Sequence, residues 1–79
     1  MTIGVDYNVY QYVAEALAGL EGYNLDDFFV EQEGDYYFFE DWDFLMDLLG
    51  LQEQNGAIWA VSMRPSQESQ LGIVGYYAP

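Results

Sequence analysis

Carboxylates interleaved with aromatic rings dominate the middle of the chain, in the segment 26–47, DDFFVEQEGDYYFFEDWDFLMD. Between residues 21 and 53 lie 11 of the chain's 14 acidic residues and no Lys, Arg or His. Carboxylates can act as general acids and bases, bind hard cations, or form a fixed negative surface that attracts basic partners. The rings indicate a folded or binding segment, because disordered acidic tails contain few aromatics.

Enzymatic chemistry has little support in these residue types. The sequence contains no His, Cys or Lys, so its serines lack the usual groups that activate a hydroxyl. Paired carboxylates can hydrolyse a glycoside, but they need a cleft, and a chain of 79 residues has no obvious cleft-forming lobes. We therefore expect no enzymatic activity and no cofactor.

Binding of a divalent cation is the second possible role of these carboxylates, because calcium and magnesium prefer oxygen ligands. Four acids are close in sequence: Glu40, Asp41, Asp43 and Asp47. The EF-hand pattern fails, since Leu45 stands at the next ligand position and no glycine follows it. We expect a solvated acidic helix face and no metal site. A melting shift with calcium that a chelator reverses would indicate a calcium-binding domain instead.

The third possible role of these carboxylates is to form a fixed negative surface. The net charge is −13, and ordinary surfaces mix both signs. Like charges on neighbouring elements cost stability, so the bias indicates selection for an electrostatic field. One Arg and no Lys cannot neutralise phosphates, which argues against direct binding of nucleic acid and of anionic membranes. Such a field attracts a basic protein surface.

Length and hydrophobicity predict a single domain spanning residues 1–79. The chain is 52% hydrophobic, which is enough for a core despite its charge. It has no cysteine and hence no disulfide framework. The start, MTIGVDYNVY, lacks the basic region and apolar run of a signal peptide. No window approaches the roughly 18 apolar residues of a membrane span, so we expect a cytoplasmic protein.

Apolar periodicity predicts two helices. The first covers 7–20, with Asp6 as its N-cap and Gly22 as the better stop. The second covers 42–49, between a capping Asp41 and Gly50. Strands are expected at 28–32, 36–40, 57–64 and 71–77, turns at 33–35 and 65–69, loops at 23–27 and 52–56, and a lead-in at 2–5.

This order predicts an α+β fold of the type αββαββ, with a four-stranded, mostly antiparallel sheet and both helices on one face. The segments LAGLEGYN (17–24) and LLGLQEQN (48–55) share Leu, Gly, Leu and Asn at an offset of 31 residues. Two αββ units would produce such a repeat, and a chance match explains it equally well.

Four consecutive rings occupy residues 36–39, so a strand there must place two of them on each face. The expected core residues nearby are Phe28, Val30, Phe38 and Trp42. The remaining rings would be exposed or covered, either in a homodimer or by a partner. Tyr36 and Tyr37 are candidates for that contact, because tyrosine is typical of interface hot spots.

Small size, extreme acidity, absence of cysteine and rings among carboxylates resemble the DNA-mimic proteins of phages and mobile elements. These include anti-CRISPR and anti-restriction inhibitors and uracil-glycosylase inhibitors. The resemblance is one of composition and covers mainly residues 21–53. It implies an inhibitor whose carboxylates stand in for phosphates in the DNA-binding groove of a basic protein, such as a CRISPR effector or a restriction enzyme. The candidate contacts are Asp26, Asp27, Glu31, Glu33, Asp35, Tyr36, Tyr37, Glu40, Asp41, Asp43 and Asp47.

The main alternative is an acidic adaptor or immunity-type protein that binds a basic partner outside any nucleic-acid site. Duplex DNA distinguishes the two classes. A DNA mimic and duplex DNA exclude each other from the target, whereas an adaptor forms a ternary complex with both.

Overall fold

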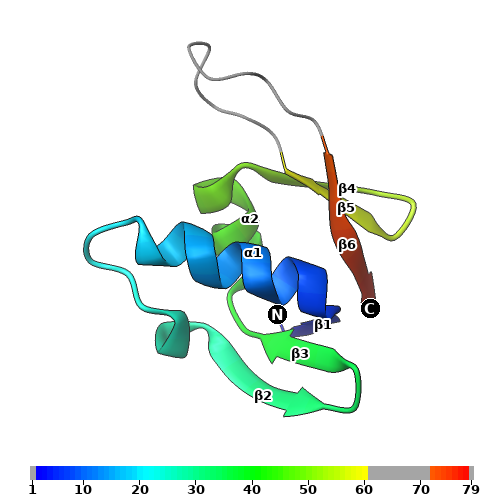
Figure 1. Cartoon of the computed structure of the whole chain (residues 1–79), viewed down its shortest axis with the longest axis horizontal. Coiled ribbons are helices and arrows are strands. Elements are labelled where there is room, and N and C mark those ends of the chain that lie inside the picture. The colour runs from blue at the N-terminus through cyan, green and yellow to red at the C-terminus, as the bar shows by residue number, and fades with distance from the viewer. Residues whose placement is uncertain (1, 61–71, 79) are drawn as a thin grey trace.

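A computed structural model of the chain describes residues 2–60 and 72–78. In chain order its elements are β1 (Ile3–Val5), α1 (Tyr7–Ala18), the 3₁₀ helix η1 (Leu25–Asp27), β2 (Phe29–Glu33), β3 (Tyr36–Phe39), α2 (Trp42–Leu49), β4 (Leu51–Gln54), β5 (Ala57–Ala60) and β6 (Gly72–Ala78). The strands form one six-stranded antiparallel sheet in the order β2-β3-β1-β6-β5-β4. Figure 1 shows this sheet curving around the two helices, with β2 and β3 below, β6 at the right and β4 and β5 above.

The α+β class is confirmed, but the four-stranded sheet and the αββαββ order are wrong. Two strands, β1 and β4, lie where a lead-in and a loop were predicted. The predicted turn at 65–69, the predicted strand end at 61–64 and the first residue of the predicted strand 71–77 lie outside the residues that the structure describes. Within the described ranges, neither helix is long and apolar enough to cross a membrane.

Strand β1 is short but central, because it pairs with β3 on one side and with β6 on the other. All three of its residues are buried, with Ile3 and Val5 in the core. Gly4 lies opposite Phe38, and a Cβ at Gly4 would come within 2.8 Å of that ring. The Phe38 ring therefore packs directly over Gly4, and a side chain at that position would have to displace the ring. A three-residue strand covered on both faces has no alternating pattern to reveal it.

Strand β4 forms a hairpin with β5 through the two-residue turn Asn55-Gly56. Both turn residues have positive φ, 54° and 81°, as a type I′ turn requires. Only Leu51 of β4 is buried, and the next three residues are exposed. This polar edge strand lacks the apolar alternation from which strands are recognised, so the predicted loop at 52–56 is wrong for a physical reason.

Helix α1 begins as predicted. The Asp6 carboxylate accepts a hydrogen bond from the backbone N–H of Val9 at 3.0 Å, which is an N-cap. The helix ends at Ala18 rather than at residue 20, because Gly19 already serves as its C-cap. Gly22, predicted to be the better stop, lies in the following turn with a φ of 88°.

Helix α2 has the predicted bounds, and Gly50 ends it in the left-handed conformation at a φ of 68°. Asp41 precedes the helix but does not cap it with its side chain, since its own backbone is left-handed at a φ of 53°. After Gly19 the chain makes a turn, whereas after Gly50 it enters β4. The two segments of the sequence repeat therefore adopt different structures, and the fold contains two strands, β1 and β6, beyond any pair of αββ units.

One hydrophobic core joins both helices to the sheet. Its buried members are Ile3, Val5, Val9, Val13, Leu17, Phe28, Phe39, Trp42, Leu45, Leu51 and Ile58. Phe39 lies among other rings, with centroids 5.7 Å from Phe29, 6.1 Å from Tyr10 and 5.6 Å from Trp42. Val30, predicted to be core, is 48% exposed because the register of β2 shifts at this residue.

Asp6 also connects α1 to β6. Its second carboxylate oxygen accepts a hydrogen bond from the N–H of Tyr76 at 2.9 Å, and its own N–H donates to the carbonyl of Tyr76 at 3.0 Å. A Cβ at Gly75 would overlap this carboxylate. Strand β6 pairs with β5 before this point and with β1 after it. The Asp6 carboxylate thus joins the helix start to the strand that links the two halves of the sheet.

We predict that Asp6→Ala and Gly75→Ala each destabilise the protein and that their effects are strongly non-additive. Loss of an N-cap costs about 1–2 kcal/mol, and Gly75→Ala should displace the same carboxylate. In the Asp6→Ala background the added methyl group has nothing to displace, so Gly75→Ala should cost little there. Urea unfolding of the four proteins measures the cycle.

The control for this cycle is Glu15→Ala, an exposed position in the middle of α1. It should change the unfolding free energy by no more than about 0.5 kcal/mol. Additive effects of the Asp6 and Gly75 substitutions would contradict the described junction.

Candidate functional site

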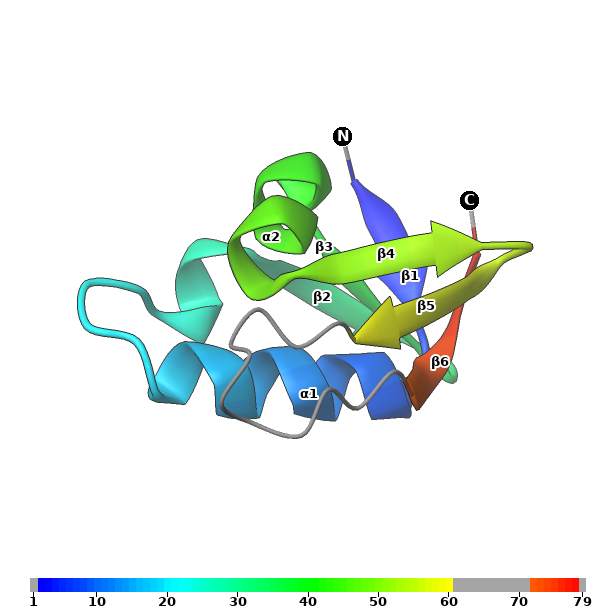
Figure 2. The same cartoon turned by 90° about the horizontal axis from the view of Figure 1, so that it is seen from above.

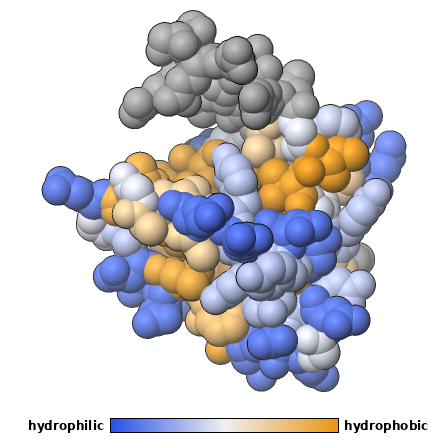
Figure 3. Space-filling model, viewed as in Figure 1, coloured by the Kyte–Doolittle hydropathy of each residue, from blue (hydrophilic) through white to orange (hydrophobic). Residues whose placement is uncertain are grey.

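All eleven carboxylates between residues 21 and 53 are exposed. The acids outside that span are Asp6, Glu15 and Glu68, and Glu68 lies outside the described residues, as does Arg64, the chain's single basic side chain. Over residues 2–60 and 72–78 the surface therefore presents negative charge without any Lys, Arg or His to offset it. Figure 3 shows hydrophilic residues along the lower edge of the molecule, where Figure 1 places β2, β3 and their turn.

The edge strand β2 carries two of the predicted contacts on one face. Beyond the register shift at Val30, Glu31 lies opposite Phe38 and Glu33 lies opposite Tyr36. Side chains two residues apart on a strand are ~6–7 Å apart and point the same way. The prediction that Glu31 and Glu33 share a face is thus confirmed. Asp35 does not continue the row, because it belongs to the turn that follows Glu33.

A second group of acids gathers at the other end of this hairpin. Asp26 and Asp27 lie in η1, directly before Phe28. The backbone N–H of Glu40 donates to the carbonyl of Phe28 at 2.8 Å, which brings the end of β3 next to η1. The Phe28 ring also stacks on Phe44 in α2 at 6.0 Å, so the first turn of α2 is adjacent as well.

The structure therefore places most of the predicted acids in two groups along the β2–β3 hairpin and at its junction with α2, which together we call the acidic edge. It consists of Asp26, Asp27, Glu31, Glu33, Asp35, Glu40, Asp41 and Asp43. Asp47 lies one helical turn beyond Asp43 on α2. Among the described residues, no three acidic side chains are grouped in a way that could hold a metal ion.

The two predicted contact tyrosines lie on opposite faces of the sheet. Tyr36 is 42% exposed and shares the outer face with Glu33. Tyr37 is half-buried against α1, where its ring stacks on Tyr10 at 4.3 Å.

Of the four consecutive rings at residues 36–39, only Phe39 is fully buried. The proposal of a homodimer, or of a face used by the partner, remains a prediction that sedimentation at high concentration can test.

Two exposed rings near the acids were missed by the sequence analysis. Phe44 is 49% exposed beside η1, and Tyr7 is 53% exposed at the first position of α1. Tyr7 lies 5.8 Å from Tyr37 between ring centroids. Helical periodicity alone does not show which other elements lie beside them.

A hollow of about 320 Å³ lies between the start of α1 and the β2–β3 turn. Its lining residues are Asp6, Tyr7, Asn8, Gln32, Gly34, Asp35 and Tyr37. The turn is held by a hydrogen bond from the Gln32 side-chain amide to the Gly34 carbonyl at 3.3 Å. Two acidic residues and two tyrosines therefore line the same depression.

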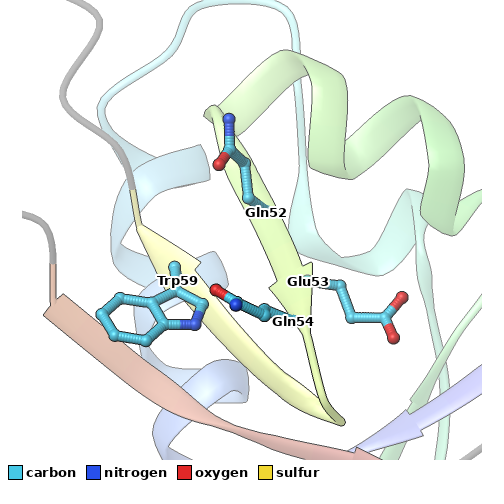
Figure 4. A pocket seen from close by; sticks show the side chains of 4 residues that line it. All are labelled: Gln52, Glu53, Gln54 and Trp59. Carbon is cyan, nitrogen blue, oxygen red and sulfur yellow. The ribbon is translucent and has the colours of Figure 1, made fainter.

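A second hollow, of about 290 Å³, lies on the β4–β5 hairpin and is lined by Gln52, Glu53, Gln54 and Trp59. Figure 4 shows Trp59 beside Gln54, while the carboxylate of Glu53 points away from the indole. Partial burial, together with a hydrogen bond to the Glu53 carboxylate and its negative charge, raises the pKa of Tyr77 to about 12. Glu53 therefore lies near Tyr77, on the other half of the sheet from the acidic edge, although it is exposed like the other acids.

Comparison with known proteins finds no matching family model, no similar curated protein and no similar solved structure. The function of this chain must therefore be inferred from its own geometry and charge.

We predict that salt stabilises the protein. The acids of the acidic edge repel one another, and salt screens such repulsion over about 10 Å at 0.1 M. The melting temperature should rise between about 0.01 M and about 0.3 M NaCl. A variant with Glu31→Gln, Glu33→Gln and Asp35→Asn should show a smaller rise. A flat or falling melting temperature in the wild type would contradict the argument.

We predict that stability falls as the pH rises from about 10 to about 12. Because the folded-state pKa of Tyr77 is about 12 and its ordinary value is 10.0, the folded state holds this proton more tightly than the unfolded state. Its stabilising contribution is therefore complete below pH 10 and disappears toward pH 12. Melting temperatures across this range measure the loss. Tyr77→Phe should remove much of it, whereas Tyr76→Phe, at a 60% exposed neighbour, should not.

Proposed function

We propose that this chain is an acidic DNA-mimic inhibitor. Its acidic edge would occupy the nucleic-acid-binding surface of a host defence or DNA-processing protein, such as a CRISPR effector or a restriction enzyme. The observation that carries the proposal is the exposure of every carboxylate between residues 21 and 53, with no basic side chain among the described residues to neutralise them.

The spacing of the acids supports mimicry of a nucleic-acid backbone. Glu31 and Glu33 are ~6–7 Å apart along β2, and one strand of B-DNA carries a charge per about 3.4 Å of helix axis. An extended edge strand thus presents about one carboxylate for every two nucleotides. The acids of η1 and of the β3–α2 junction add to this density. Grooves that bind phosphates with Lys and Arg recognise charge and position rather than base sequence.

Protection of an edge strand is a simpler explanation for some of these acids. An exposed edge can pair with another chain, and charges or a bulge prevent this. Strand β2 has both, in Glu31, Glu33 and the register shift at Val30. That role requires only a few charges on β2 itself. It does not explain the exposed acids of η1 and α2, which form no part of the edge ladder.

Rings on the same face provide contacts that phosphates lack. Tyr36 and Phe38 lie opposite Glu33 and Glu31, so apolar and negative groups alternate on the outer face of the β2–β3 hairpin. Partly exposed aromatics of this kind are typical anchors in protein interfaces. We therefore expect the carboxylates to steer association and the rings to slow dissociation.

We predict that the combined variant Glu31→Lys, Glu33→Lys and Asp35→Lys loses at least about 100-fold in affinity for the target, because each reversal replaces an attraction of about 1 kcal/mol or more with a repulsion. The target is first captured from a bacterial lysate with the wild-type protein and then isolated for titration calorimetry. Asp43→Lys with Asp47→Lys should have a smaller effect and tests whether α2 belongs to the surface.

The matched control is Glu15→Lys, an exposed acid on α1 outside the acidic edge. It should bind within a few-fold of wild type, and all variants should keep the wild-type circular dichroism spectrum. Wild-type affinity in the triple variant would refute the proposal. An equal loss in the Glu15 control would show that net charge, rather than the acidic edge, determines binding.

A further inference from the structure

The hollow beside the start of α1 is distinct from the row of acids on β2, although both meet at the β2–β3 turn. Figures 1 and 2 both place the first turn of α1 next to that turn. The two rings that line it, Tyr7 and Tyr37, come from α1 and β3. Their centroids are 5.8 Å apart with planes tilted by 50°. No room remains between the rings, so a bound group must lie on the exposed side of Tyr7.

The two tyrosine rings are not equally accessible to a ligand. Tyr37 is held by Tyr10, on which it stacks at 4.3 Å, and by Phe29 at 6.4 Å. Tyr7 has fewer neighbours of this kind and is 53% exposed. Packing thus fixes Tyr37 as the floor of the hollow and leaves the Tyr7 ring with a face open to a ligand.

Charge decides which ligand the hollow can hold. The N-terminus of a helix carries about half a positive charge, which by itself would favour an anion. Here the full negative charge of Asp6 lies at that terminus, with its oxygens bonded to the N–H groups of Val9 and Tyr76. Asp35 adds a second, exposed carboxylate from the turn. The hollow therefore repels anions and attracts cations.

We propose that this hollow receives an arginine side chain of the partner protein; the proposal rests on the function proposed above and names an anchor point within it. A guanidinium group can stack on the exposed Tyr7 ring and donate hydrogen bonds to the Asp35 carboxylate at the same time. Lysine lacks the planar group that stacks on a ring. Calcium needs six to eight oxygen ligands, and the hollow offers only two carboxylates, one of them already engaged.

The test is a residue-resolved NMR titration of the intact protein at fixed ionic strength. The probe is N-acetyl-arginine amide, and N-acetyl-lysine amide serves as the comparison. We expect saturable shifts at Tyr7, Asp35 and Tyr37 with the arginine probe, and an affinity about two- to five-fold weaker with lysine, the range of an exposed cation–π contact.

Matched variants separate the hollow from the general negative field. Asp35→Asn and Asp43→Asn remove the same charge, and only the first should weaken the arginine probe by more than two-fold. Tyr7→Ala should weaken it similarly, while Tyr7→Phe should retain it. Uniform shifts over the whole acidic edge, or equal effects of Asp35→Asn and Asp43→Asn, would overturn the proposal.

Failure of this inference can be told apart from failure of the proposed function. If the target binds Tyr7→Ala and Asp35→Asn as tightly as wild type but loses the triple charge reversal, DNA mimicry stands and the arginine site is refuted. If Tyr7→Ala and Asp35→Asn weaken target binding but the double reversal Glu31→Lys with Glu33→Lys leaves it unchanged, the arginine site stands and the mimicry by the β2 carboxylates is refuted.

Discussion

The carboxylate of Asp6 fixes the geometry on which the rest of the structure depends. It caps α1 through Val9 and binds the backbone of β6 at Tyr76, at the point where β6 passes from β5 to β1. Gly75 leaves the space that this carboxylate fills. The contact sets the position of α1 against the sheet, and with it the aromatic cluster that supports the β2–β3 hairpin. An acid that takes part in folding thus positions the acids that face solvent.

A rigid support is necessary because the acidic edge repels itself. Beneath the hairpin, Phe39 packs against Phe29, Tyr10 and Trp42, so apolar burial offsets the electrostatic cost of the outer face. The other half of the described sheet is much less acidic: β4 contains one acid, Glu53, which lies near Tyr77, and β5 and β6 contain none. This division of charge favours one face for a basic partner and leaves the other half to structural roles.

Sequence patterns predicted the elements whose signals are local. Both helices follow from apolar periodicity, and the β2–β3 hairpin follows from its β-formers and a central glycine. The short central β1 carries no such signal, because pairing with distant residues creates it. The edge strand β4 pairs with its neighbour β5, but its exposed residues lack the apolar alternation of a half-buried strand. The exposure of the acids was predictable from residue type. Their grouping was not, since it depends on the contact of Phe28 with Glu40 and Phe44, and on a register shift at Val30.

The central claim is that the acidic edge takes the place of DNA on its target. The most direct measurement mixes the isolated target, a labelled duplex that it binds, and a titrated excess of this protein, and determines the composition of each complex by analytical ultracentrifugation. The account predicts two mutually exclusive complexes, target with duplex and target with protein, with the duplex released in proportion to the protein added. A stable ternary complex of target, duplex and protein would contradict it and would identify an adaptor that binds elsewhere.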